Sequence, residues 1–208
     1  MKKFLNEYLK FANRLADEAG FISMDYWRTS IDVDDKSHNN PVTIADRNAE
    51  LKIRSMIEKE YPDHGILGEE FDSINPDAEF VWVIDPIDGT HIFIGGHKDF
   101  GNLISLTQNK KPIIGIINCP AHKERWVGVK NQNSTINNQP SKTSSVTSIE
   151  DAYFLTSGLY FNEPHLRNAV EKIKHKVRYY RYSGSCYMFG MVASGLIDFV
   201  IEDSLKVH

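Results

Sequence analysis

The sequence lacks the features that define several large classes of protein. Its 208 residues include only two cysteines, Cys119 and Cys186, and no CxxC spacing, which excludes a disulfide framework and argues against a zinc site. No apolar stretch approaches the roughly 20 residues that a membrane-spanning helix needs. Basic runs are also missing, and 24 Lys and Arg stand against 28 Asp and Glu. Neither nucleic acid nor an anionic membrane is therefore expected as the main partner.

What is present is typical of a globular protein. Hydrophobic residues make up 41% of the chain and charged residues 25%, which excludes an intrinsically disordered or low-complexity protein. A chain of this length buries a sizeable core without disulfides or metals. We expect a cytoplasmic protein with two reduced thiols.

Apolar spacing predicts two helices in the first part of the chain. The first covers residues 4–27, and the second starts at Thr43, where Asp46 stands at the third helical position as in a capping box, and stops at Tyr61. Short apolar runs with turn residues between them then predict strands, among them a hairpin around residues 109–110.

The later part of the chain alternates strands and helices, which indicates a layered α/β arrangement. Residues 131–148 consist almost wholly of Asn, Gln, Ser and Thr and are the best candidate for a boundary. We expect an N-terminal α+β part over residues 1–145 that binds metal and phosphate, and a C-terminal α/β part over residues 146–208.

The segment 82–90 carries the most chemical information. An apolar strand delivers Asp85 and Asp88 to a turn at Gly89, with the backbone carbonyl of Ile87 between the two carboxylates. Oxygen ligands of this kind suit Mg²⁺. The amides of Gly89 and of the residue after it, if they open a helix, point at an anion and hold a phosphate. A plain turn is the alternative interpretation, because Pro, Asp and Gly are common turn formers.

Four other charged positions have ordinary explanations when they are taken singly. Glu69 and Glu70 follow a short apolar run and a glycine, and an isolated acidic pair is usually a solvated surface feature. Asp46 lies in the first turn of its helix, where a favourable interaction with the helix dipole explains it. Lys36 lies in a polar loop, where most lysines are surface residues.

Together and in order, these segments resemble the inositol monophosphatase family. The segments that carry the resemblance are NPVTIAD (Asn40–Asp46), GEE (Gly68–Glu70), DPIDGT (Asp85–Thr90), GSC (Gly184–Cys186) and the strand Ile197–Glu202. The resemblance extends from the N-terminal helix to the last residue, and PVTxADR is similar to the bacterial branch that includes histidinol-phosphate phosphatases. It implies the layered αβαβα sugar-phosphatase fold, in which mixed sheets have helices between and outside them.

The family consists of Mg²⁺-dependent, Li⁺-sensitive phosphomonoesterases that are commonly homodimers. By resemblance, Glu69, Asp85 and the Ile87 carbonyl bind one Mg²⁺, and Asp85 and Asp88 contribute to a second among two or three ions. Two such ions clamp the attacking and leaving oxygens and lower the pKa of a bound water.

The resemblance also implies which residues act on water and on the substrate, a small phosphorylated alcohol. Thr90, hydrogen-bonded to Asp46, orients or activates the attacking water, Glu69 helps to position it, and Lys36 lies in the outer electrostatics. The residues on the substrate side are Asp88, Gly89, Thr90, Gly184, Ser185, Cys186 and Glu202.

The end of the sequence departs from the family pattern. In the family, the strand that corresponds to the one bearing Glu202 is followed by a short segment and then by an aspartate that ligates the second metal. Residues 205–208 supply the short segment, and the sequence ends there. We therefore expect a C-terminal part that is incomplete relative to the family and a weakly held second Mg²⁺.

Three functions stay open at this point. The first is Mg²⁺-dependent hydrolysis of a small monoester of the inositol 1-phosphate or histidinol phosphate type by a metal-activated water. The second is a nucleotide 3′-phosphatase activity of the same superfamily. The third is a non-catalytic, phosphate-binding protein, which the missing aspartate favours.

Overall fold

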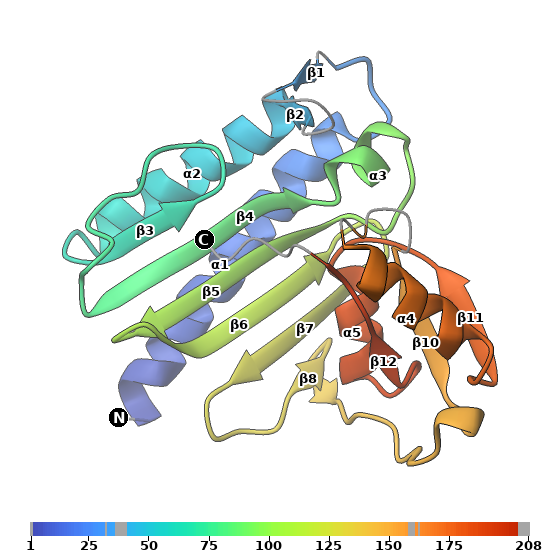
Figure 1. The fold of residues 1–208 in the computed structure, drawn as a ribbon. Helices are drawn as coiled ribbons and strands as arrows, with labels where there is room; N and C mark the ends of the chain where they lie inside the picture. Colours follow the sequence, from blue (N-terminus) through green and yellow to red (C-terminus); the bar gives the residue numbers. More distant parts are fainter. Residues whose placement is uncertain (1, 32, 36–40, 158–160, 162, 204–208) are drawn as a thin grey trace.

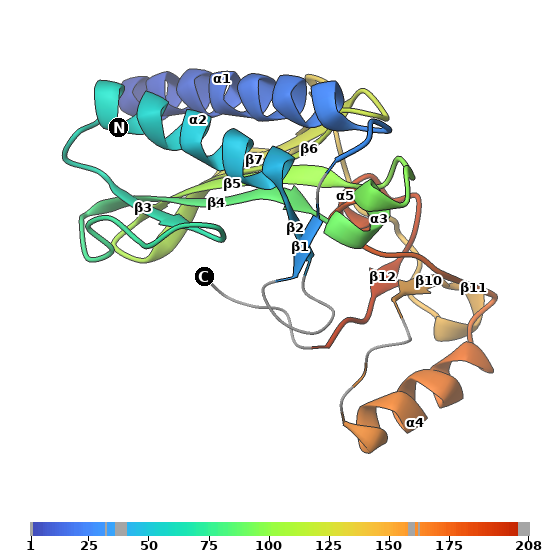
Figure 2. The same ribbon diagram turned by 90° about the horizontal axis from the view of Figure 1, so that it is seen from above.

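The computed structural model describes residues 2–31, 33–35, 41–157, 161 and 163–203. Two helices, α1 (Lys2–Tyr26) and α2 (Ile44–Glu60), lie side by side on one face of a seven-stranded sheet (Figures 1 and 2). The sheet has the order β3-β4-β5-β6-β7-β8-β9, with β3 and β4 parallel and every other pair antiparallel. Its strands are β3 (Gly65–Gly68), β4 (Phe80–Asp88), β5 (Gly101–Gln108), β6 (Lys111–Cys119), β7 (Glu124–Val129), β8 (Thr135–Ile136) and β9 (Gln139–Pro140). Both helices fall close to their predicted ranges.

The start of α2 has the capping box that the sequence predicts. The Thr43 hydroxyl accepts hydrogen bonds from the amides of Ala45 and Asp46, and the Asp46 carboxylate accepts one from the Thr43 amide at 2.8 Å. A short antiparallel pair, β1 (Val33–Asp35) and β2 (Pro41–Thr43), leads into this cap. The cap fixes where α2 begins, and hence where Asp46 lies.

The main core fills the space between the two helices and the large sheet. Alternate residues of β4 and β5 point into it, and Trp82 is fully buried against Phe11 of α1, with ring centroids 5.3 Å apart. The buried members of this core are Phe11, Ala12, Leu15, Ala16, Ala19, Ile53, Ile57, Ile66, Trp82, Ile84, Ile104, Leu106, Ile113, Ile114 and Ile116. This burial anchors the strand that carries the aspartates.

The second part of the chain forms a three-stranded parallel sheet with the order β11-β10-β12. Its elements are α4 (Pro164–Lys174), α5 (Tyr187–Ala193), β10 (Tyr153–Thr156), β11 (Tyr179–Tyr182) and β12 (Phe199–Val200), preceded by a 3-10 turn at Ile149–Asp151. Helix α5 lies between the two sheets and α4 lies on the outer side of the small one (Figure 2). The layers therefore run helix, sheet, helix, sheet, helix, and the predicted αβαβα fold is confirmed.

The polar stretch 131–148, the candidate boundary, contains regular structure. Residues 135–140 form a hairpin, β8 with β9, that extends the large sheet. Asn137 and Asn138 at its tip have φ of 46° and 64°, as the left-handed positions of a two-residue hairpin turn require. Asn109 and Lys110 do the same in the predicted β5–β6 hairpin, with φ of 50° and 63°. The division at residues 145 and 146 stays a prediction.

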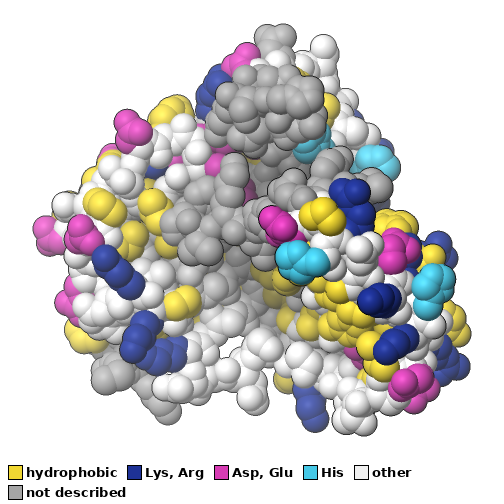
Figure 3. All heavy atoms as spheres, in the orientation of Figure 1, with side chains coloured by type: hydrophobic (Ala, Val, Ile, Leu, Met, Phe, Trp, Pro, Cys, Tyr) yellow, Lys and Arg dark blue, Asp and Glu magenta, His cyan; other side chains and the backbone are white. Residues whose placement is uncertain are grey.

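The surface carries mixed charge on the face shown in Figure 3. Among the coloured side chains there, dark blue Lys and Arg and magenta Asp and Glu are interspersed. Within the described part of the chain, no helix combines the length and the apolar character that crossing a bilayer requires.

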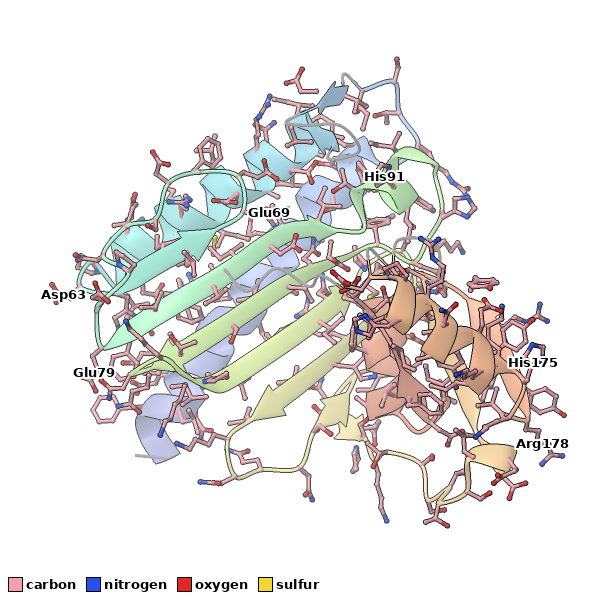
Figure 4. All side chains as sticks on the ribbon, viewed as in Figure 1. Asp63, Glu69, Glu79, His91, His175 and Arg178 are labelled. Atoms are coloured by element: carbon pink, nitrogen blue, oxygen red, sulfur yellow. The ribbon has the colours of Figure 1, made fainter. Side chains whose placement is uncertain are left out.

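An aromatic cluster packs around Phe80 at the start of β4, at the opposite end of this strand from Asp85 and Asp88. His64 stacks on Tyr61 and Phe80, with ring centroids 4.7 and 5.1 Å away, and its Nδ1 accepts a hydrogen bond from Trp82 Nε1 at 3.1 Å. Burial lowers the pKa of His64, while the charges of Asp63 and Glu79 partly oppose this shift (Figure 4). The neutral ring is therefore the form that fits the fold.

We expect acidification to weaken the fold through His64. Because its folded-state pKa lies below the unfolded value of about 6.5, the stabilisation is complete above that pH and is lost as pH falls toward the folded-state pKa. The free energy of unfolding in urea, measured from pH 7.5 to pH 5, should fall more steeply for the wild type than for His64→Gln. Parallel profiles would show that His64 contributes nothing to the pH dependence.

Candidate active site

The aspartates lie at the end of a strand that does not stop where the sequence suggests. β4 continues through Asp88, and its pairing with β5 shifts register between Asp85 and Asp88. The two carboxylates therefore project from an irregular stretch within β4, and the alternative interpretation of this segment as a plain turn is wrong. β3 runs parallel to β4 with Gly68 opposite Ile84, so Glu69 follows at the same sheet edge as Asp85 (Figure 4).

The surroundings of Asp85 disfavour the charged form of its side chain. The side chain is partly exposed, but its Oδ1 is enclosed and has no hydrogen-bond partner among the described residues. Burial raises the pKa of Asp85 well above its ordinary value, and the negative charges of Asp88 and Glu69 raise it further. An enclosed carboxylate oxygen among like charges is an environment that a cation stabilises.

Asp88 connects the metal-ligand candidates to the turn at residues 184–186. Its Oδ2 accepts a hydrogen bond from the Cys186 amide, 98 residues further along the chain. Burial raises the pKa of Asp88, the Cys186 hydrogen bond partly offsets that rise, and the charges of Glu69 and Glu202 add to it. The predicted substrate-side turn therefore does reach the predicted metal ligands.

Gly89 permits this close approach. It has φ of 82°, a conformation that favours glycine, and a Cβ built on it lies 2.8 Å from the Cβ of Ser185. Ser185 also has a positive φ of 69°, and its hydroxyl donates a hydrogen bond to the Asp99 carbonyl. The short helix α3 (Thr90–Ile94) begins directly after Gly89, as predicted. Any side chain at position 89 would push the two turns apart.

Thr90 and Asp46 interact less directly than the resemblance implies. The Thr90 hydroxyl lies 3.1 Å from the Ile87 carbonyl and 3.5 Å from Asp46 Oδ1. Its single proton is therefore directed mainly at Ile87, because 3.5 Å is the outer limit of a hydrogen bond. Asp46 is bound chiefly by Thr43; burial raises its pKa, the Thr43 hydrogen bonds oppose that shift, and Glu69 adds to it.

The remaining predicted residues are distributed around this centre. Glu202 accepts hydrogen bonds from the amide and the hydroxyl of Ser157, the latter at 2.6 Å, so it ties the end of β10 to the segment after β12. Gly184 precedes the turn that contacts Asp88. Lys36 lies outside the described residues.

Comparison with known proteins identifies the family. The sequence pattern that defines the inositol monophosphatase family matches residues 5–208. The chain belongs to this family.

Its relatives carry several related names. It is 38% identical to the chloroplastic bifunctional phosphatase IMPL2 of Arabidopsis thaliana over 98% of this chain, and it spans 60% of that relative's length. It is 34% identical to a histidinol-phosphatase of Chlorobaculum parvum over 93% of this chain and 76% of the relative. An inositol monophosphatase structure from Zymomonas mobilis superposes with a TM-score of 0.85 at 40% identity, covering 97% of this chain and 78% of that one.

A ladder of two buried amides, Asn102 and Asn118, supports the part of β4 between Asp85 and Asp88, and no sequence motif predicts it. The Asn102 amide donates to the Pro86 carbonyl at 2.7 Å and to the Ser23 hydroxyl at 2.9 Å. Asn102 Oδ1 accepts from the Asn118 amide at 2.8 Å, and Asn118 Oδ1 accepts from Arg125 Nε at 2.9 Å. These residues are isolated in sequence, and only the β5–β6 pairing brings the two asparagines together.

The donor set fits a hard divalent cation. Within the described ranges, no three His, Cys, Asp or Glu side chains already converge at metal-ligand spacing. The carboxylates of Glu69, Asp85 and Asp88 are nonetheless close enough to raise the pKa of Asp85, and one Asp85 oxygen is enclosed without a partner. Carboxylate oxygens at the end of a strand, beside the Ile87 carbonyl, are the ligand type that Mg²⁺ prefers.

Truncating the ladder should destabilise the fold. Asn102→Ala removes the Asn102 donor from the Pro86 carbonyl and the Asn102 acceptor from one N–H of the Asn118 amide, which keeps its bond to the Ala16 carbonyl, and each unpaired buried group costs about 1–3 kcal/mol. Ser105→Ala on the same strand removes a single hydrogen bond to the Ile114 carbonyl and is the matched control. Urea unfolding should give a clearly larger loss for Asn102→Ala, and equal losses would contradict the ladder's role.

Removing the Asp85 charge should stabilise the protein in the presence of EDTA. A carboxyl whose folded-state pKa is raised stabilises the fold only while it is protonated, and this contribution is lost as pH rises through that pKa. Asp85→Asn should therefore have a higher Tm than the wild type at pH 7.5 in EDTA, and the difference should disappear toward pH 4. Asp77→Asn, an exposed aspartate paired with Lys110, is the control and should show no such gain.

Proposed function

We propose that the protein is a Mg²⁺-dependent phosphomonoesterase that hydrolyses small phosphate esters of the histidinol phosphate or inositol 1-phosphate type. The observation that carries the proposal is the group of like-charged carboxylates from Glu69, Asp85 and Asp88, with an enclosed, unpartnered Asp85 oxygen. The names of the relatives, a histidinol-phosphatase, an inositol monophosphatase and a bifunctional phosphatase, support it.

Glu69, Asp85, Asp88 and the Ile87 carbonyl are the ligands in this proposal, for two or three ions. When bound, Mg²⁺ supplies positive charge that offsets the repulsion between the phosphate dianion and the attacking water. Asp88 keeps one oxygen on the Cys186 amide, which leaves its other oxygen for a cation. Li⁺ is the expected inhibitor.

The protein's own groups then orient water and substrate. Thr90 and Asp46 hold the attacking water, since the Thr90 hydroxyl can accept from water while it donates to the Ile87 carbonyl. Glu69 helps to position this water, and the resemblance assigns Lys36, which lies outside the described residues, to the outer electrostatics. The water oxygen forms a new bond to phosphorus and gives one proton to a carboxylate of the site. The ester P–O bond breaks, and the leaving alkoxide takes up a proton from solvent water.

The substrate side is built from two segments. The amides of Gly89 and Thr90, with Asp88, hold the phosphate. The leaving alcohol faces the turn at Gly184, Ser185 and Cys186 and the carboxylate of Glu202. The reason is that this turn contacts Asp88, one of the residues that hold the phosphate. A carboxylate there favours an alcohol that carries hydroxyl or cationic groups. We infer a cytoplasmic homodimer.

Phosphate release tests the proposal. The wild type should release inorganic phosphate from histidinol phosphate or inositol 1-phosphate only with Mg²⁺, and Asp88→Asn should lower kcat/KM about 100-fold or more, as expected when a preorganised electrostatic group is lost. Asp77→Asn has the same chemical change on an exposed side chain and should leave the activity unchanged. Activity of Asp88→Asn equal to the wild type would refute the metal-ligand assignment.

The substrate panel separates the alternatives. Preferential turnover of nucleotide 3′-phosphates would favour the nucleotide phosphatase. Phosphate binding by calorimetry without turnover of any ester would favour a non-catalytic, phosphate-binding protein.

A further inference from the structure

Helix α2 contains an ion pair that is almost completely removed from water. Arg54 Nε lies 2.8 Å from Glu50 Oε1, and the exposed fractions of the two side chains are 7% and 0%. The residues are one helical turn apart, at a spacing where such pairs usually face solvent. A buried ion pair is weak evidence for stability, because the desolvation of both charges offsets their attraction. Its remaining contacts indicate another role.

Both side chains reach across to the segment that follows β3. Glu50 Oε2 accepts a hydrogen bond from the Glu70 amide at 2.8 Å. Arg54 Nη2 donates one to the Phe71 carbonyl at 2.9 Å, and the guanidinium lies over the Phe71 ring, 5.7 Å from its centroid. The pair therefore binds two consecutive backbone positions directly after Glu69.

The residue before Glu69 is also in contact with the pair. A Cβ built on Gly68 lies 2.0 Å from Glu50 Oε1 and 2.9 Å from Arg54 Nη2, so no side chain fits there. Glycine at position 68 allows the ion pair to lie directly against the end of β3. Glu69 is thus fixed on both sides, by this contact before it and by the two hydrogen bonds after it.

We propose that Glu50 and Arg54 are positioning residues that hold the Glu69 backbone beside Asp85 and so set the affinity of the site for Mg²⁺. The inference rests on the proposed function, because it gives Glu69 a role toward the cation.

The physical need for such a clamp is repulsion. Glu69 lies close enough to Asp85 for its charge to affect that carboxyl, and Asp46 and Asp88 add further negative charge. A loop held only by its own backbone bonds would move away from this cluster. The Glu50–Arg54 pair resists the movement while it adds no net charge to the site.

Glu50→Gln tests the clamp with almost no change of shape. A glutamine offers one oxygen and one NH₂ group where two oxygens now accept from Arg54 and from the Glu70 amide, so one of those donors meets another donor. Isothermal titration of the intact protein should show a Kd for Mg²⁺ raised about 10–100-fold, as is typical for residues that orient metal ligands. At saturating Mg²⁺, kcat should fall by a smaller factor than the affinity does, because bound Mg²⁺ then holds the Glu69 carboxylate in place of the clamp.

Arg54→Lys provides a second, milder variant. A lysine keeps the positive charge beside Glu50 but has no second donor fixed toward the Phe71 carbonyl. The Kd for Mg²⁺ should rise by a smaller factor than in Glu50→Gln. If Glu50→Gln does not fold, Arg54→Lys decides the question alone.

Ile53→Val is the matched control for a merely structural role. Ile53 is fully buried in the same helix and contributes to the main core. It should lower the Tm without changing the Kd for Mg²⁺. An equal rise of Kd in Ile53→Val would show that global stability, not positioning, controls the affinity.

The outcomes for the wild type and the variants are separable. If the wild type does not bind Mg²⁺, both the proposed function and this inference are refuted. Tight binding by the wild type and equally tight binding by both variants removes the inference alone.

Discussion

Mutual repulsion among four carboxylates is the constraint on which this structure depends. Asp46, Glu69, Asp85 and Asp88 affect one another's ionisation at one edge of the large sheet. The fold keeps them together by placing them on elements that are fixed elsewhere. β4 is anchored by Trp82 and Ile84 in the main core, and α2 is anchored by its capping box. Core packing thus opposes electrostatic repulsion at the site.

Among the described residues, the hydrogen bonds that hold Asp46 and Asp88 come from uncharged groups. The Cys186 amide binds Asp88, and the Thr43 amide and hydroxyl bind Asp46. A lysine or arginine paired directly with each aspartate would have lowered its pKa, and it would also have competed with a cation. At Asp46 and Asp88, these dipoles leave the negative charge of the carboxylate in place, which suits a site proposed to bind Mg²⁺.

The sequence allowed the local features to be predicted. The α2 cap follows from Thr43 and Asp46, three residues apart, and the β5–β6 hairpin follows from two residues that tolerate positive φ. The resemblance to the family predicts that Glu69, Asp85 and Asp88 share one site, and the structure brings the three side chains near one another. These features depend on short spacing or on an ordered set of motifs.

Other features depend on tertiary contacts that short-range patterns do not encode. The β4 bulge arises from pairing with β5, and a Pro-Ile-Asp-Gly string is equally compatible with a turn. Asn102 meets Asn118 only because β5 and β6 pair in this register. Glu50 and Arg54 have the spacing of a surface pair, and the segment after β3 buries them. The hydrogen bond between Thr90 and Asp46 that the resemblance implies is long, because the Thr90 hydroxyl lies closer to the Ile87 carbonyl than to the Asp46 carboxylate.

The hydrogen bond between Asp88 and Cys186 has a consequence for the order in which the protein is made. It closes a loop of 98 residues, whereas β4 pairs with β3 and β5 across much shorter separations. During synthesis the N-terminal segments are free to fold as they leave the ribosome, well before residue 186 is translated. Until residue 186 is translated, Asp88 lacks the amide that donates this hydrogen bond. Completion of the site therefore requires the second half of the chain, because the carboxylate of Asp88 is translated well before the turn that contacts it.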